Sequence, residues 1–175
     1  MLSATGGIGN LGALQRHQFT AYPGLGDAKY VALQAGIEIG RRALRDRMER
    51  SSPISDATAA KRFLIAELGH RPREAFCALF LDTRHRVITF ETLSLGTIDS
   101  ATVHPREVLK RVLEINAAAV IFAHNHRSGV CEPSTTDASL TRTLRAALKL
   151  IDVTVLDHLV VAADEIVSFA DIGLL

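Results

Sequence analysis

Two histidines, a serine and an aspartate lie close together in the chain, within the stretch VIFAHNHRSGVCEPSTTD that ends at Asp137. His124 and His126 end a short apolar run, and side chains two residues apart on a strand project to the same face. Two imidazoles placed in this way can bind one metal ion, and the Asp137 carboxylate can supply a third ligand. The fourth zinc position would then stay open for water, as it does in catalytic zinc sites. The spacing therefore predicts a catalytic metal centre.

A second interpretation of the same stretch needs no metal. Ser134 and Asp137 fit the S-x-x-D pattern of a capping box, in which each side chain bonds the backbone N–H group of the other at a helix start. His124 and His126 alone are a weak metal signal. The combination favours the metal site, because helix capping does not require a His-x-His that is followed, after seven intervening residues, by Ser-x-x-Asp.

The composition excludes several other classes of protein. A chain of 175 residues with 47% hydrophobic and 22% charged residues is typical of a globular protein with one sizeable core and a small added module. Its longest apolar run, Ala117 to Ala123, is too short to span a membrane, and its first residues lack the features of a signal peptide, so we expect a cytoplasmic protein. Cys77 and Cys131 are too few for a disulfide framework or a four-cysteine zinc site. Any metal must be bound mainly by histidines and carboxylates.

The net charge of +1 hides an asymmetry along the chain. Residues 1–73 contain 11 Lys and Arg against 6 Asp and Glu, whereas the remainder contains 9 against 13. The basic N-terminal part is the better candidate for contact with an anionic polymer. A solvated helix face around GRRALRDRMER is an equally good explanation of these charges.

The N-terminal part is predicted to be helical. The stretch begins with a Pro-Gly turn and reads YPGLGDAKYVALQAGIEIGRRALRDRMER. Its apolar residues fit either the spacing of a helix or the alternation of a strand. Helix is favoured because the stretch is long and rich in Ala, Leu, Glu and Arg. SSPIS interrupts the pattern, and a second helix is expected from Ser55 until Gly69 stops it. We therefore divide the chain into a module over residues 1–52 and a domain over residues 53–175.

The remainder of the chain mixes strands with helices. AFCALFLD and RVITFETLSLG are expected to form a hairpin, and AAVIFAH a buried strand. HPREVLKRVLEINA is expected to be a helix with Pro105 in its first turn and Glu107 paired with Arg111. TTDASLTRTLRAALKLI is predicted to be a second helix, and further strands close the chain. The expected class is mixed α and β (α+β), with a mixed or mostly antiparallel sheet flanked by helices.

These residues carry a family resemblance. HNH, RSGVCEP and STTD resemble the motif of the JAMM, or MPN-plus, zinc metalloprotease domain. The chain is also similar to the bacterial RadC-like family over residues 73–175. Three segments carry this similarity: GTIDSATVHPREVLKRVLEINAAAVIFAHNH, VLDHLVV and VSFADIGLL. The resemblance implies the JAMM/MPN (cytidine-deaminase-like) fold, a curved mixed sheet flanked by helices. Here a small all-α module would precede it.

The resemblance also implies a mechanism. A Zn²⁺ cofactor would lower the pKa of its bound water to roughly 7. The implied zinc ligands are His124, His126 and Asp137. A glutamate just ahead of the first strand would be the general base, and Glu74 occupies that place, with Glu91 as the second choice. Ser134 would donate a hydrogen bond to the oxyanion. The implied reaction is hydrolysis of an amide or isopeptide bond in a peptide substrate.

The loop after the second histidine departs from the family pattern. Arg127 stands where the family usually has proline, which affects the expected loop geometry and activity more than metal binding. Cys131 in the same loop fits either a zinc-inhibiting or redox role or an inert thiol. Asp157 and His158 fit either a role in orienting a metal ligand or a place in the core.

The N-terminal module resembles the second half of a helix-hairpin-helix, carried by YPGLGDAKYVALQAGIEIGRR. The resemblance implies that Gly24, Gly26 and Lys29 contact a nucleic-acid phosphate at the helix start. A packing or homodimerisation element is the alternative.

The sequence therefore predicts two alternative functions for the chain. The first is a zinc hydrolase, and the second is a nucleic-acid-binding or interaction protein that keeps the metal site without catalysis.

Overall fold

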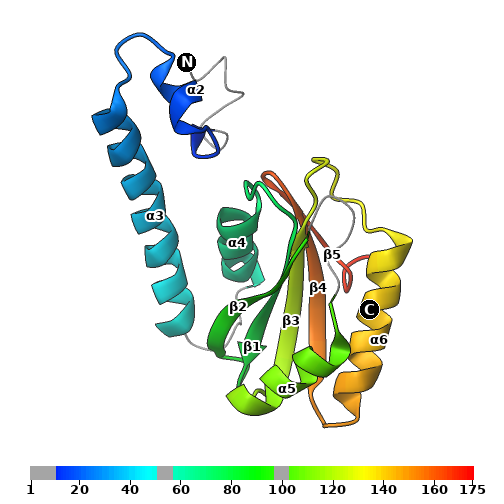
Figure 1. Ribbon diagram of the computed structural model, residues 1–175. Coiled ribbons are helices and arrows are strands. Elements are labelled where there is room, and N and C mark those ends of the chain that lie inside the picture. Colours follow the sequence, from blue (N-terminus) through cyan, green and yellow to red (C-terminus); the bar gives the residue numbers. More distant parts are fainter. Residues whose placement is uncertain (1–10, 51–56, 97–102) are drawn as a thin grey trace.

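The computed structural model describes residues 11–50, 57–96 and 103–175, which form a mixed α and β fold (Figure 1). The helices are α2 (Arg16–Thr20), α3 (Asp27–Arg50), α4 (Ala57–Leu68), α5 (Pro105–Ile115) and α6 (Thr135–Lys149). The strands are β1 (Ala75–Leu81), β2 (Val87–Leu95), β3 (Ala119–Asn125), β4 (Thr154–Ala162) and β5 (Glu165–Ser168). The mixed class predicted from the sequence is confirmed.

The strands form one five-stranded sheet in the order β2-β1-β3-β4-β5. β3 and β4 pair in parallel, and the other neighbours pair antiparallel, so the sheet is mixed as predicted. α4 packs on one face and α5 and α6 on the other (Figure 1). β1 and β3 are buried along their whole length because both faces are covered, which explains their uninterrupted apolar sequences.

The two central strands present alternate side chains to the two cores. Ile121 and Ala123 of β3 face α4, whereas Val120 and Phe122 face α5 and α6. His124 follows in the second series and therefore lies on the α6 side of the sheet. This alternation places the first candidate ligand next to the start of α6.

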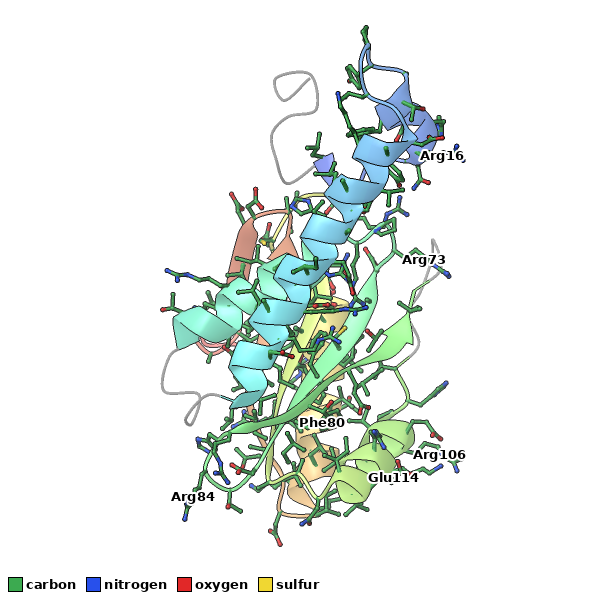
Figure 2. All side chains as sticks on the ribbon, turned by 90° about the vertical axis from the view of Figure 1, so that its left-hand side faces the viewer. Arg16, Arg73, Phe80, Arg84, Arg106 and Glu114 are labelled. Atoms are coloured by element: carbon green, nitrogen blue, oxygen red, sulfur yellow. The ribbon has the colours of Figure 1, made fainter. Side chains whose placement is uncertain are left out.

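The basic N-terminal segment is a helix, as the composition favoured. α3 runs for 24 residues, and Figure 2 shows Arg16 of α2 near the end of α3 that lies away from the sheet. The buried carboxylate of Glu67 in α4 joins α3 to α4, since Arg45 Nη2 of α3 lies 3.0 Å from Glu67 Oε1. Arg71, which follows α4, contacts the other oxygen, with its Nη2 3.4 Å from Oε2. No helix among the described residues is both long and apolar enough to span a membrane.

Two local predictions had different outcomes. The helix before Gly69 ends there as expected, at Leu68, while the expected start at Ser55 lies outside the described residues. The Glu107–Arg111 pair is wrong, because the Arg111 guanidinium reaches across to β2 and binds Glu91 in two hydrogen bonds of 2.7 and 2.5 Å. A bidentate contact to a half-buried carboxylate is stronger than an exposed pair within one helix.

Candidate metal centre

The candidate ligands lie where the end of β3 meets the start of α6. His124 belongs to β3 and is only 8% exposed, His126 follows the strand, and Asp137 lies in the first turn of α6. The backbone N–H of His126 donates to Val161 O at 2.8 Å, so β4 still holds the chain just beyond the end of β3. Both imidazoles are therefore carried by backbone that is fixed within the sheet.

The side chains of these three residues converge on one point. His124 Nε2 and His126 Nε2 are 2.9 Å apart, and they lie 3.3 and 3.4 Å from Asp137 Oδ1 and Oδ2. Donor atoms about 2.0–2.1 Å from a tetrahedral metal are about 3.3 Å from one another. The spacing of the three groups is close to that of a zinc ligand set, and the three were predicted together from their spacing in the chain.

The capping interpretation is confirmed at the same residues. The Ser134 hydroxyl accepts from Asp137 N at 3.1 Å and donates to Asp137 Oδ2 at 2.5 Å, and Ser134 N donates to Asp137 Oδ2 at 2.8 Å. Two donors thus occupy Oδ2, which leaves Oδ1 as the better metal ligand. Capping and metal binding are compatible, because the cap orients the carboxylate that would bind the metal.

A buried chain of hydrogen bonds determines the tautomer of His124. Thr141 Oγ1 donates to the Asp137 carbonyl oxygen at 2.7 Å, so it can only accept from His158 Nδ1, which lies 2.6 Å away. His158 Nε2 is then an unprotonated acceptor for His124 Nδ1, 2.9 Å away. His124 therefore carries its proton on Nδ1 and presents the Nε2 lone pair to the convergence point.

The second histidine is oriented by a simpler contact. His126 Nδ1 lies 2.9 Å from the carbonyl oxygen of Val130, which can only accept, so Nδ1 carries the proton. Both Nε2 atoms then face the Asp137 carboxylate as acceptors, with no donor between them. Only a cation, either a shared proton or a metal ion, makes this arrangement favourable. The residues therefore fit a divalent metal of the zinc type.

The ionisation of the surrounding groups agrees with this arrangement. Burial alone would raise the pKa of the Asp137 carboxyl, but when a shared proton also sits on His124 Nε2, the hydrogen bond and charge of His124 and the hydrogen bonds from Ser134 hold that pKa well below its usual range. Burial, followed by the charge of His124, lowers the pKa of His158 to about 3. Asp137 is thus ionised and His158 neutral at neutral pH, as a metal ligand and its oriented partner require.

The two candidate general bases lie in different surroundings. Glu74 is exposed and directly precedes β1, and continuing the β1–β3 register beyond Phe76 and His124 places it opposite His126. Its neighbour Arg73 lies at the end of the β1–β2 hairpin opposite to Arg84 (Figure 2). Glu91 lies within β2, and its hydrogen bond with the Arg111 guanidinium lowers the pKa of its carboxyl. These surroundings favour Glu74 over Glu91.

Three other residues near the centre have clear positions. Asp157 accepts from the backbone N–H groups of His158 and Ala170, so it holds backbone rather than a ligand. Cys131 is buried with its Sγ 3.5 Å from Val160 O, and burial raises the pKa of its thiol, which favours the inert interpretation. Arg127 is exposed and has no ion pair with any residue that the structure describes.

Two residues near the centre were not singled out from the sequence. Thr141 lies one helical turn after Asp137, a spacing that could have suggested its contact with the ligand pair. Asn125 lies between the two histidines, and its side chain bonds the backbone on either side of Glu74. Polar side chains in a buried strand could have marked it, since such groups require partners.

Of the residues predicted to contact phosphate, Gly24 and Gly26 lie in the turn before α3 and Lys29 lies in the first turn of that helix. Gly24 has a φ of +76°, which favours glycine, and a Cβ at Gly24 or Gly26 would meet nothing within 4 Å. Lys29 Nζ donates to Gly24 O at 2.7 Å and therefore bonds its own turn. Asp27 at the helix start pairs with Arg16. The turn is open to solvent, and the lysine and glycines are adjacent.

Comparison with known proteins gives a consistent result. The model of the family described as RadC-like JAB domain matches residues 54–174. A UPF0758 protein from Chromohalobacter salexigens is 54% identical over 99% of this chain and 77% of its own length. A UPF0758 protein from Nitrosococcus oceani is 52% identical over 100% of this chain and 78% of its own length. The names of these relatives state no activity.

Proposed function

This chain belongs to the RadC-like JAB domain family, and on that premise we propose that it is a zinc-dependent hydrolase of the JAMM type that cleaves an amide or isopeptide bond. The observation that carries the proposal is the convergence of two imidazole lone pairs and one carboxylate on a point where no donor lies between them. Ordinary packing does not produce that arrangement, because facing acceptors repel one another.

His124, His126 and Asp137 would hold the zinc, which would supply Lewis acidity at the site and make water easier to deprotonate. Glu74, which directly precedes β1 beside the end of β3, accepts a proton from the attacking water on its carboxylate and releases it to the leaving nitrogen. The buried chain from His124 through His158 to Thr141 keeps the ligand in one tautomer during turnover.

Ser134 assists by donating a hydrogen bond to the carbonyl oxygen of the scissile bond as negative charge develops there. Its hydroxyl proton is directed at Asp137 Oδ2 in the structure, so this role requires the hydroxyl to rotate. The backbone N–H of Ser134 continues to hold Oδ2 at 2.8 Å after that rotation. The cap can therefore lose the hydroxyl proton while the carboxylate stays oriented.

The test is a Glu74→Gln variant assayed against a panel of peptide and isopeptide substrates. Because glutamine is similar in shape but cannot accept the proton, we expect zinc to stay bound and turnover to fall by about 10² to 10⁴. The matched control is Glu132→Gln, in the exposed loop before Ser134, which should leave both quantities unchanged. Full turnover in Glu74→Gln would contradict the assignment of the base.

A second function is favoured by the open turn before α3. The backbone at Gly24 and Gly26 is accessible and belongs to the basic part of the chain, so we propose that it contacts nucleic-acid phosphates. Binding of a DNA duplex should weaken as salt increases and should weaken further in Lys29→Ala, while Lys149→Ala on α6 serves as the control. DNA binding that is equal in Lys29→Ala and the parent would count against this function.

A further inference from the structure

The ladder between β1 and β3 ends beside the metal centre. Phe76 and His124 are the last paired residues, and the next position on β3 is Asn125. The Asn125 side chain is buried, with the residue only 2% exposed, and it continues the contact between the strands in place of the backbone. Its Oδ1 accepts from Ala75 N at 2.9 Å, and its Nδ2 donates to Arg73 O at 3.3 Å.

These two bonds lie on either side of Glu74, the proposed general base. On the other side of the same segment, Gly96 N donates to Glu74 O at 2.8 Å, just beyond the end of β2. Three backbone groups around Glu74 are therefore hydrogen-bonded, namely the carbonyls of Arg73 and Glu74 and the N–H group of Ala75. The backbone at Glu74 is held from both neighbouring strands, so only the side-chain torsions of the glutamate remain free.

The amide is the side chain that suits this position. One contact needs an acceptor for an N–H group and the other needs a donor to a carbonyl oxygen, and asparagine offers both at adjacent atoms. An aspartate would keep the acceptor but would place negative charge against the carbonyl of Arg73. An alanine would leave a buried N–H group without its partner.

We propose that Asn125 is a positioning residue that sets the place of the Glu74 carboxylate relative to the two histidines. The inference rests on the proposed function. Asn125 lies between His124 and His126 in sequence, and strand alternation directs its side chain to the opposite face of the sheet. One short segment thus binds the metal with two residues and positions the base with the third. A displacement of the base carboxylate by about 1 Å can lower the rate 10²-fold, so fixing its position matters for catalysis.

The experiment measures the carboxyl carbon of Glu74 by NMR in protein labelled at glutamate, before and after zinc is added, with the signal assigned from the Glu74→Gln variant. In the parent we expect zinc to shift this signal. In Asn125→Ala and in the isosteric Asn125→Asp we expect about one zinc per chain still to bind, because all three ligands remain, but the shift of the Glu74 signal to be lost. Hydrogen exchange at Ala75 N–H should become faster in Asn125→Ala.

The control is Val112→Ala, which opens a small cavity in the buried face of α5 and should keep the zinc-induced shift. A full shift in either Asn125 variant would overturn the positioning role while leaving the proposed hydrolase intact. Loss of zinc from both Asn125 variants would also overturn it, because Asn125 would then act on the ligands. Failure of the parent to bind zinc would instead refute the proposed function itself.

Discussion

The Thr141→Val substitution tests the buried chain of hydrogen bonds behind His124. Valine has nearly the same shape but has no hydroxyl, so His158 Nδ1 loses its partner at 2.6 Å. A bare Nδ1 costs less to bury without a partner than an unpaired Nδ1–H group, so His158 changes tautomer, which makes its Nε2 a donor and forces the proton of His124 onto its own Nε2. That proton would occupy the position where the metal binds, so metal affinity must fall.

The expected magnitude follows from the burial of the groups. Thr141 is 1% exposed and His158 is 0% exposed, so no water can replace the lost hydroxyl. Loss of a partner that orients a metal-binding histidine typically costs 10- to 100-fold in affinity, or about 1.4 to 2.7 kcal/mol. The unsatisfied imidazole should also lower the free energy of unfolding of the metal-free protein by about 1 to 3 kcal/mol.

Zinc affinity would be measured by competition with a chromophoric chelator, and the tautomers by long-range ¹H–¹⁵N NMR of the imidazoles. Thr143→Val is a matched control, since the Thr143 hydroxyl makes the same bond to the carbonyl four residues earlier, at 3.0 Å, but on the exposed side of α6. Thr143→Val should bind zinc as the parent does. Unchanged zinc affinity in Thr141→Val would refute the tautomer argument.

Two further predictions concern stability. Because the pKa of His158 is lowered from 6.5 to about 3, the unfolded state binds more protons between these values, so His158 stabilises the metal-free fold above pH 6.5 and this contribution is lost as the pH falls. Urea denaturation should show that, between pH 7 and pH 5, the free energy of unfolding falls by about 2 kcal/mol more in the parent than in His158→Gln. Equal decreases in the two proteins would contradict the lowered pKa of His158. Thermal denaturation should show that Gly69→Ala destabilises the fold by about 3 kcal/mol, since a Cβ there would lie 2.0 Å from Ala163 O, whereas Gly36→Ala on the open side of α3 should stabilise it by up to about 1 kcal/mol. Equal effects of the two alanines would show that the close approach is absent.

The elements could be predicted from the sequence because their signals are local. The apolar run that ends at His124 is long enough for a strand and too short for most helices, and the Ser134–Asp137 cap marks where α6 begins. The grouping of the two histidines with Asp137 could be predicted for the same reason, since Asp137 is only thirteen positions after His124.

Contacts between distant parts of the chain could not be predicted in the same way. The partner of Arg111 is Glu91 on β2, and the sequence offered Glu107, one helical turn away, as a nearer choice. The bond from Asn125 to Ala75 joins residues 50 positions apart, and no periodicity marks it. Such pairings depend on the order and register of the strands, which sequence patterns do not specify.

The central claim is most directly tested by measuring zinc per chain in protein purified without a histidine tag or added metal, together with the His126→Ala variant. The convergence of His124, His126 and Asp137 predicts about one zinc in the parent and none in the variant, because two ligands cannot retain the ion against dialysis. No zinc in either protein, even after zinc is offered and the excess is removed, would contradict the metal centre and leave Ser134 and Asp137 with only their role as a helix cap.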